Sequence, residues 1–142
     1  MSSDAALRDL ADREAIRDLV RRYAHCVWQR DAAGAAALFA ANGSMEIGDR
    51  PPLRGRAAIR AEYEASFAAS HFRPMLHNHV IALAGDRATG TCYLELTAQL
   101  EGVERVGRGH YDDTYVREDD GWKFASRVLT LAHFAEASTP RG

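Results

Sequence analysis

The sequence predicts an α+β domain in which helices cover one face of a curved, mainly antiparallel sheet. In the first half of the 142-residue chain, apolar residues recur at every third or fourth position, which is typical of amphipathic helices. In the second half, long segments rich in alternating apolar and polar residues are separated by short turns that contain glycine. Helices followed by such a meander indicate that the helices pack on one side of the sheet.

Three helices are predicted before the meander. The first begins at Asp4, a residue type that caps helices, and ends near Val27. The second begins after Asp31 and ends at 42–43, because the Asn-Gly pair there tolerates the left-handed conformation that stops a helix. The third covers 56–70, a segment with one apolar face.

The strands follow from alternation and turn residues. A short strand is expected at 44–47, and the meander is expected to contain four long strands, at 75–84, 88–101, 103–118 and 122–135. Strands of this length need curvature, which glycines such as Gly107 and Gly109 allow. Residues 136–142 are expected to form a loose tail.

Composition excludes several classes of function. A net charge of −2 provides no basic field for nucleic acid, and no stretch approaches the roughly 20 apolar residues that span a bilayer. The two cysteines, Cys26 and Cys92, have neither disulfide-framework nor metal-site spacing, which is typical of a reducing compartment. We therefore expect a cytoplasmic protein of one domain, with no nucleic-acid or membrane partner.

Three stretches carry a family resemblance: Arg22-Tyr23-Ala24 leading through Asp31 to Leu38-Phe39-Ala40; Leu53-Arg54-Gly55-Arg56-Ala57-Ala58-Ile59; and Gly109-His110-Tyr111-Asp112-Asp113 running into Asp120-Gly121-Trp122-Lys123-Phe124 and Arg127. With them the sequence resembles the SnoaL-like family of the nuclear-transport-factor-2-like superfamily, from about residue 5 to 134. The resemblance implies one SnoaL-like domain over 1–142, with a cone-shaped, barrel-like curved sheet. It also implies a pocket between the helices and the concave face, suited to an apolar ligand with rings.

The resemblance also shows what this chain lacks. In scytalone dehydratase and hexachlorocyclohexane dehydrochlorinase, an Asp of the first helix orients a His at the start of the first long strand. Here those positions hold Trp28 and Pro74, and Asn78 follows four residues later at a position that resembles the family pattern. An indole N–H only donates, and proline has no proton to transfer, so a His-Asp base is absent from these positions.

Ketosteroid isomerase, another relative, suggests a different set of residues. Its oxyanion-binding Tyr matches Tyr23, and its oxyanion-binding Asp corresponds to Asp113 or, with a shift of one, to Asp112. The position of its base holds Ile47. Tyr23 and a protonated Asp113 would therefore form an anion hole without a base beside it.

Each candidate also has a purely structural interpretation. Tyr23 lies on an apolar helix stripe and is equally a core tyrosine, and Asp113 is equally a cross-strand partner of Arg127 or Arg108. The candidate catalytic residues are Tyr23 and Asp113, and the candidate substrate-binding residues are Trp28, Ile47, Pro74, Asn78, Tyr111 and Arg127. The spacing of His77 and His79 places both on one strand face, but without a third ligand we expect no metal, and we expect no cofactor.

Two functions remain open. The first is a cofactor-independent lyase, isomerase or cyclase acting on a hydrophobic, polycyclic or aromatic small molecule without the His-Asp dyad. The alternative is a non-catalytic module for hydrophobic-ligand binding or assembly. Apolar positions on the outer face of the last strands lead us to expect a homo-oligomer. The family resemblance implies a homodimer or a homotrimer.

Overall fold

The computed structural model describes residues 2–137, so most of the expected tail at 136–142 lies outside the described residues. Three helices and six strands follow in chain order as α1 (Ser3–Trp28), α2 (Ala32–Ala37), β1 (Phe39–Ile47), β2 (Leu53–Arg54), α3 (Arg56–Ala69), β3 (Ser70–Ala84), β4 (Arg87–Leu100), β5 (Val103–Glu118) and β6 (Gly121–Glu136). The strands form one open, mixed sheet in the order β2-β1-β6-β5-β4-β3. The pairing of β1 with β6 is parallel, and the other pairings are antiparallel.

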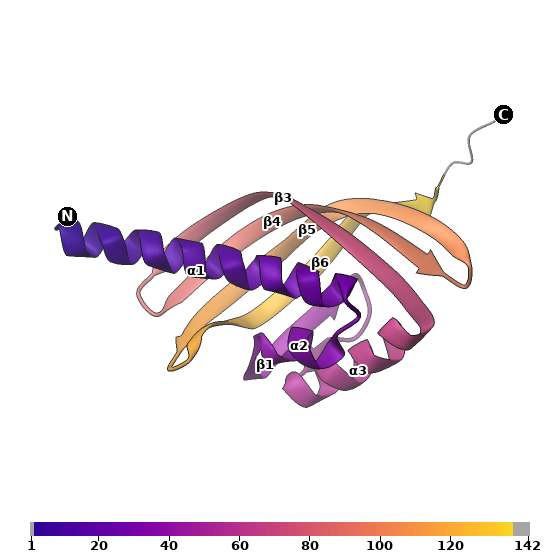
Figure 1. Cartoon of the computed structure of the whole chain (residues 1–142), viewed down its shortest axis with the longest axis horizontal. Helices are drawn as coiled ribbons and strands as arrows, with labels where there is room; N and C mark the ends of the chain where they lie inside the picture. Colours follow the sequence, from indigo (N-terminus) through magenta and orange to yellow (C-terminus); the bar gives the residue numbers. More distant parts are fainter. Residues whose placement is uncertain (1, 138–142) are drawn as a thin grey trace.

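The sheet curves around the helices. Figure 1 shows α1 lying along the concave side of the sheet, with α2 and α3 beside its C-terminal end. Bulges interrupt the register between Leu76 and His79 and between Arg108 and Gly109. A Cβ atom at Gly109 would lie 1.9 Å from the Thr130 carbonyl oxygen, so only glycine permits this approach of β6. The predicted α+β fold with helices on the concave face is confirmed.

Helix α1 joins the sheet through its apolar stripe. The buried residues of this stripe are Ile16, Leu19, Val20, Tyr23, Ala24 and Val27. They pack against a core in which the aromatic side chains of Phe39, Tyr115 and Phe124 are fully buried. The helix begins after Ser2, whose hydroxyl accepts a hydrogen bond from the Ala5 amide at 3.1 Å, so Ser2 rather than Asp4 caps it.

Two boundaries differ from the sequence prediction. The second helix ends at Ala37 and β1 begins at Phe39, because the amide of Phe124 donates to the Leu38 carbonyl and pulls the chain into the sheet. Strand β3 begins at Ser70, upstream of the expected start at position 75, and runs through Pro74. Since β3 is an edge strand, it has one side that needs no ladder hydrogen bonds, which is where sheets tolerate proline.

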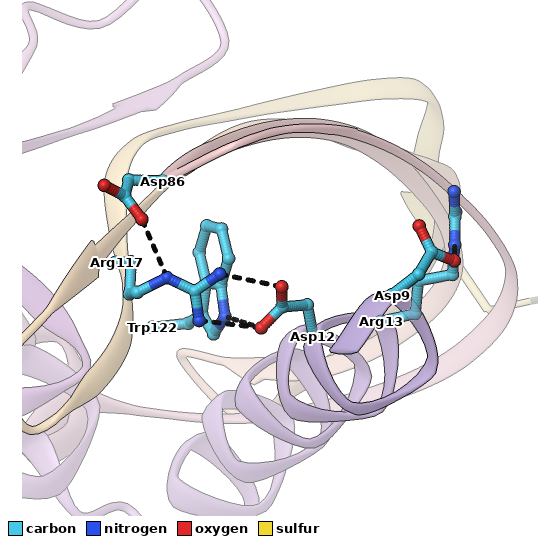
Figure 2. A network of polar contacts seen from close by, with 6 residues as sticks. All are labelled: Asp9, Asp12, Arg13, Asp86, Arg117 and Trp122. Carbon is cyan, nitrogen blue, oxygen red and sulfur yellow. Dashed lines mark hydrogen bonds and ion pairs between the residues drawn. The ribbon is translucent and has the colours of Figure 1, made fainter. Parts of the chain in front are cut away.

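The first half of α1 is held at the far end of the sheet by a polar network that we call the clasp, formed by Asp12, Asp86, Arg117 and Trp122 (Figure 2). The carboxylate of Asp12 accepts two hydrogen bonds from the Arg117 guanidinium, both at 2.7 Å, and one from the Trp122 indole at 3.2 Å. Arg117 also donates to Asp86 at 3.0 Å and stacks on the Trp122 ring. The clasp thus ties α1 to the β3–β4 and β5–β6 turns.

The outer face of the sheet keeps exposed apolar side chains, among them Met75, Val80 and Tyr93. This is the face through which the sequence predicts self-association. None of the helices in residues 2–137 combines the length and the apolar character that crossing a bilayer requires.

Candidate functional site

A cavity of about 290 Å³ lies between α1, α3 and the concave face of the sheet. Its lining is mostly apolar and consists of Tyr23, Val27, Met45, Ile47, Arg50, Tyr63, Ser66, Phe67, Phe72, Pro74, Leu96, Leu100, Tyr111, Leu129, Leu131 and Phe134. Neither an imidazole nor a carboxylate is part of this lining in the described residues. The cavity therefore suits an apolar ligand that is held by a few polar groups.

Two tyrosines from different helices meet at the cavity wall. The hydroxyl oxygens of Tyr23 on α1 and Tyr63 on α3 lie 2.5 Å apart, and both side chains are buried. Burial raises the pKa of both hydroxyls above the ordinary value of a tyrosine. Both are therefore protonated at neutral pH, and because one proton joins the pair, the other remains available to a ligand.

Tyr111 on β5 supplies a third hydroxyl. Its ring packs edge-on against Tyr23, with the ring centroids 6.0 Å apart, and its side chain is 4% exposed. Burial raises its pKa as well, so it is a proton donor rather than a base. Its hydroxyl forms no hydrogen bond with any residue of the described part of the chain, although Tyr111 lines the cavity.

A buried ion pair lies behind these tyrosines. Asp113 on β5 accepts hydrogen bonds from Nε and Nη2 of Arg127 on β6, at 2.9 and 3.3 Å, and both side chains are fully buried. The guanidinium carbon lies 3.5 Å from the ring centroid of Tyr111 and 4.4 Å from that of Tyr23. The Nη1 atom of Arg127 has no hydrogen-bond partner within residues 2–137. Its N–H groups are left to the faces of the aromatic rings, which attract a cation.

Asp113 is held by a second partner, Tyr115. Tyr115 donates to Asp113 Oδ2 at 2.8 Å, and His79 Nε2 lies 3.0 Å from the Tyr115 hydroxyl. Since Tyr115 has a single proton and gives it to the carboxylate, His79 Nε2 carries the hydrogen of its contact. Burial raises the pKa of the Asp113 carboxyl, and the charge of Arg127 with these hydrogen bonds opposes the rise.

The histidines of the His77 and His79 pattern have separate surroundings. His79 is half-buried in the Asp113 chain of hydrogen bonds, and burial with the nearby charge of Arg127 lowers its pKa to about 4. His77 is exposed, with Nε2 3.6 Å from Glu95 on the neighbouring strand. No group of three potential metal-ligating side chains occurs in the described range.

The two positions where relatives carry the dyad contact each other. The Trp28 indole donates to the Pro74 carbonyl oxygen at 2.7 Å, so a neutral hydrogen bond joins the end of α1 to β3 at this point. Pro74 is buried and lines the cavity, whereas Trp28 is 37% exposed and is not part of the lining. This contact offers no group that accepts a proton from a substrate.

The structure brings together only part of the candidate set. Tyr23, Ile47, Pro74 and Tyr111 line the cavity. Asp113 and Arg127 lie behind the tyrosine rings, and Asn78 is exposed in the bulge of β3, outside the lining.

Three lining residues with polar groups were not among the candidates: Tyr63, Ser66 and Arg50. The sequence placed Tyr63 on the apolar face of the third helix, and an aromatic hydroxyl on such a face was the available signal. Ser66 and Arg50 gave no signal, because only the packing of α3 against the loop at 48–52 brings them to the cavity.

Comparison with known proteins agrees with this architecture. A SnoaL-like domain matches residues 8–128. No functionally curated protein matches the sequence. A Mycobacterium tuberculosis protein of unknown function is 26% identical, with a TM-score of 0.82 over 90% of this chain and 76% of its own.

Two further solved structures are similar. An NTF2-like protein with a cystatin-like fold from Novosphingobium aromaticivorans is 28% identical, with a TM-score of 0.75 over 91% of this chain and 87% of its own. Hexachlorocyclohexane dehydrochlorinase LinA-type3 from Novosphingobium barchaimii is 18% identical, with a TM-score of 0.86 over 96% and 97% of the two chains, which shows the fold alone. Because the family match covers most of the chain, the protein belongs to the SnoaL-like family.

Proposed function

We propose that the protein is a cofactor-independent enzyme of the lyase or isomerase type that binds an apolar, ring-containing small molecule in the cavity. The observation that carries the proposal is the group of tyrosine hydroxyls in a mostly apolar cavity: the Tyr23–Tyr63 pair, and Tyr111, whose hydroxyl has no hydrogen-bond partner within residues 2–137. Protonated hydroxyls held in a site of low polarity stabilise negative charge that develops on a substrate oxygen. An enolate formed next to a carbonyl group is such a charge.

The residues behind the cavity have a supporting role in this proposal. Asp113 was a candidate oxyanion donor, but its carboxylate is engaged by Arg127 and Tyr115. We assign Asp113 a positioning role, because it fixes Arg127 against the rings of Tyr23 and Tyr111. The positive charge of Arg127 then stabilises negative charge that develops at those phenols. Since the lining supplies no base within residues 2–137, the substrate proton passes to water or to another group of the substrate.

Proton exchange on a two-ring ketone tests the proposal. We expect the protein to accelerate exchange of the α-protons of 1-tetralone in D₂O, followed by NMR, and Tyr23→Phe to reduce the acceleration by about 10²- to 10³-fold, the effect of losing one oxyanion donor. Tyr63→Phe should act in the same direction. Tyr93→Phe is the matched control, because Tyr93 is exposed on β4 and does not line the cavity. Exchange that does not exceed the buffer rate would contradict enolate stabilisation.

A second function is favoured by the same lining. A cavity without imidazole or carboxylate in its described walls also suits a non-catalytic module that binds a hydrophobic ligand. This function predicts that 1-tetralone binds without any exchange of its α-protons. It also predicts that the affinity, rather than a rate, falls when Tyr111 is changed to Phe.

A further inference from the structure

The cavity has one charged group in its described lining, Arg50, which follows β1 in the loop at 48–52. The Arg50 amide donates to the Ile47 carbonyl at 3.2 Å and thereby turns the chain after the strand. Its Nη2 atom donates to Glu62 Oε1 on α3 at 2.8 Å. The guanidinium therefore lies between the loop and α3, at the border of the cavity.

The position of Arg50 gives the cavity a direction. The Arg50 side chain is 58% exposed, whereas Tyr23 and Tyr111 are each 4% exposed. The cation is thus at the solvent end, and the hydroxyls are at the inner end. The same lining includes apolar side chains such as Leu129 and Leu131. A ligand that fills this space has an apolar body and meets a positive charge where it leaves the protein.

Arg50 keeps donors for such a ligand. A guanidinium has five N–H groups in a planar fork, and the contact with Glu62 uses one of them. An exposed ion pair of this kind is weak and exchanges readily, because solvent competes with it. The fork matches the two oxygens of a carboxylate and binds them with two parallel hydrogen bonds.

We propose that Arg50 binds the carboxylate of a ring-containing acid whose rings occupy the cavity. The inference names the ligand class of the site described above and rests on the proposed function in so far as that site binds a small molecule. Ligand cavities commonly measure about 300–1,000 Å³, so a cavity of about 290 Å³ corresponds to a small ligand with one or two rings. Glu62 sets the strength of the contact, because its negative charge competes with the ligand for Arg50.

The test compares two probes of nearly the same shape, 2-naphthoic acid and its neutral amide, by calorimetric titration. We expect the wild-type protein to bind the acid about tenfold more tightly than the amide, in line with a charge-assisted pair. Arg50→Gln should abolish this preference without weakening the binding of the amide. Glu62→Gln should increase the preference, because it frees Arg50. Arg54→Gln, an exposed arginine on neighbouring β2 that does not line the cavity, is the matched control and should keep it.

The outcomes separate this inference from the proposed function. Equal binding of acid and amide to the wild-type protein, or a preference that persists in Arg50→Gln, would overturn the role of Arg50 while leaving the cavity as a ligand site. If neither probe binds, the inference is overturned together with the ligand site itself. Failure of 1-tetralone exchange with an intact acid preference would overturn enolate stabilisation alone. Circular dichroism checks that each variant is folded.

Discussion

Two arginine–aspartate pairs of similar geometry lie in opposite surroundings. Arg127 and Asp113 are fully buried behind the cavity, whereas the side chains of Arg117 and Asp12 in the clasp are 39% and 19% exposed. In each pair the guanidinium donates two hydrogen bonds to one carboxylate. The two pairs differ in their surroundings. Tyr115, His79 and aromatic rings enclose the first pair, whereas the second pair contacts solvent and Trp122. The environment, rather than the contact itself, should decide what each pair contributes.

The largest effect is expected where the buried pair is broken. Asp113→Asn should lower the free energy of unfolding by about 3–5 kcal/mol, because it leaves the charge of Arg127 buried without its partner. Urea unfolding measures the change. The double variant Asp113→Leu with Arg127→Met should be more stable than the single variant, since it removes both charges together. A loss below about 1 kcal/mol in the single variant would show that the buried pair behaves like the exposed one.

The chain of hydrogen bonds around Asp113 predicts a dependence on pH. The pKa of His79 is lowered to about 4 by burial and by the charge of Arg127, from 6.5 in an ordinary environment. As the pH falls from about 6.5 to about 4, the unfolded chain binds this proton first, so stability falls across this range. Because the His79 ring is partly exposed and solvent screens it, its pKa shift should contribute only about 1–2 kcal/mol to the free energy of unfolding.

Unfolding midpoints measured between pH 7 and pH 4 test this dependence. His79→Gln, which keeps a donor for Tyr115, should flatten the profile in that range. His133→Gln, at an exposed position of β6, should leave the profile as in the wild-type protein. An unchanged profile in His79→Gln would assign the acid loss of stability to other groups.

The sequence predicted the elements that have two distinct faces. The alternation of residues 103–118 gave the bounds of β5 without error, and the expected start of the third helix at 56 agrees with α3. The sequence-based prediction was wrong where contacts between residues distant in sequence determine the backbone conformation. Phe39 is extended because it pairs with Phe124, and Ser70 is extended because it pairs with Leu100. The same holds at the site. For Asp113 the sequence left three interpretations open, an oxyanion donor or a partner of Arg127 or of Arg108, and only the register of β5 on β6 places Asp113 and Arg127 opposite each other.

A smaller effect is expected at the junction that replaces the dyad positions. Trp28→Phe keeps a ring but removes the hydrogen bond to the Pro74 carbonyl, so the free energy of unfolding should fall by about 1 kcal/mol. Chemical denaturation measures it. Because Trp28 is more exposed than Asp113, we expect the loss of free energy of unfolding to lie between the losses for the two ion pairs. A loss as large as that of Asp113→Asn would contradict this order, because it would make the junction as important for stability as the buried pair.

The smallest effect is expected in the clasp. Asp12→Asn should lower the free energy of unfolding by about 0.5 kcal/mol in dilute buffer, because solvent already screens the pair and Arg117 retains Asp86. Hydrogen bonds from Arg117 lower the pKa of Asp12, so this contribution is present at neutral pH and is lost as the pH falls below about 4. In about 1 M salt, where the screening length is about 3 Å, the difference between wild type and Asp12→Asn should shrink further, while that of Asp113→Asn should stay nearly constant. Urea titrations of both variants at low and high salt measure this contrast. An equal response of the two pairs to salt would refute the conclusion that burial separates them.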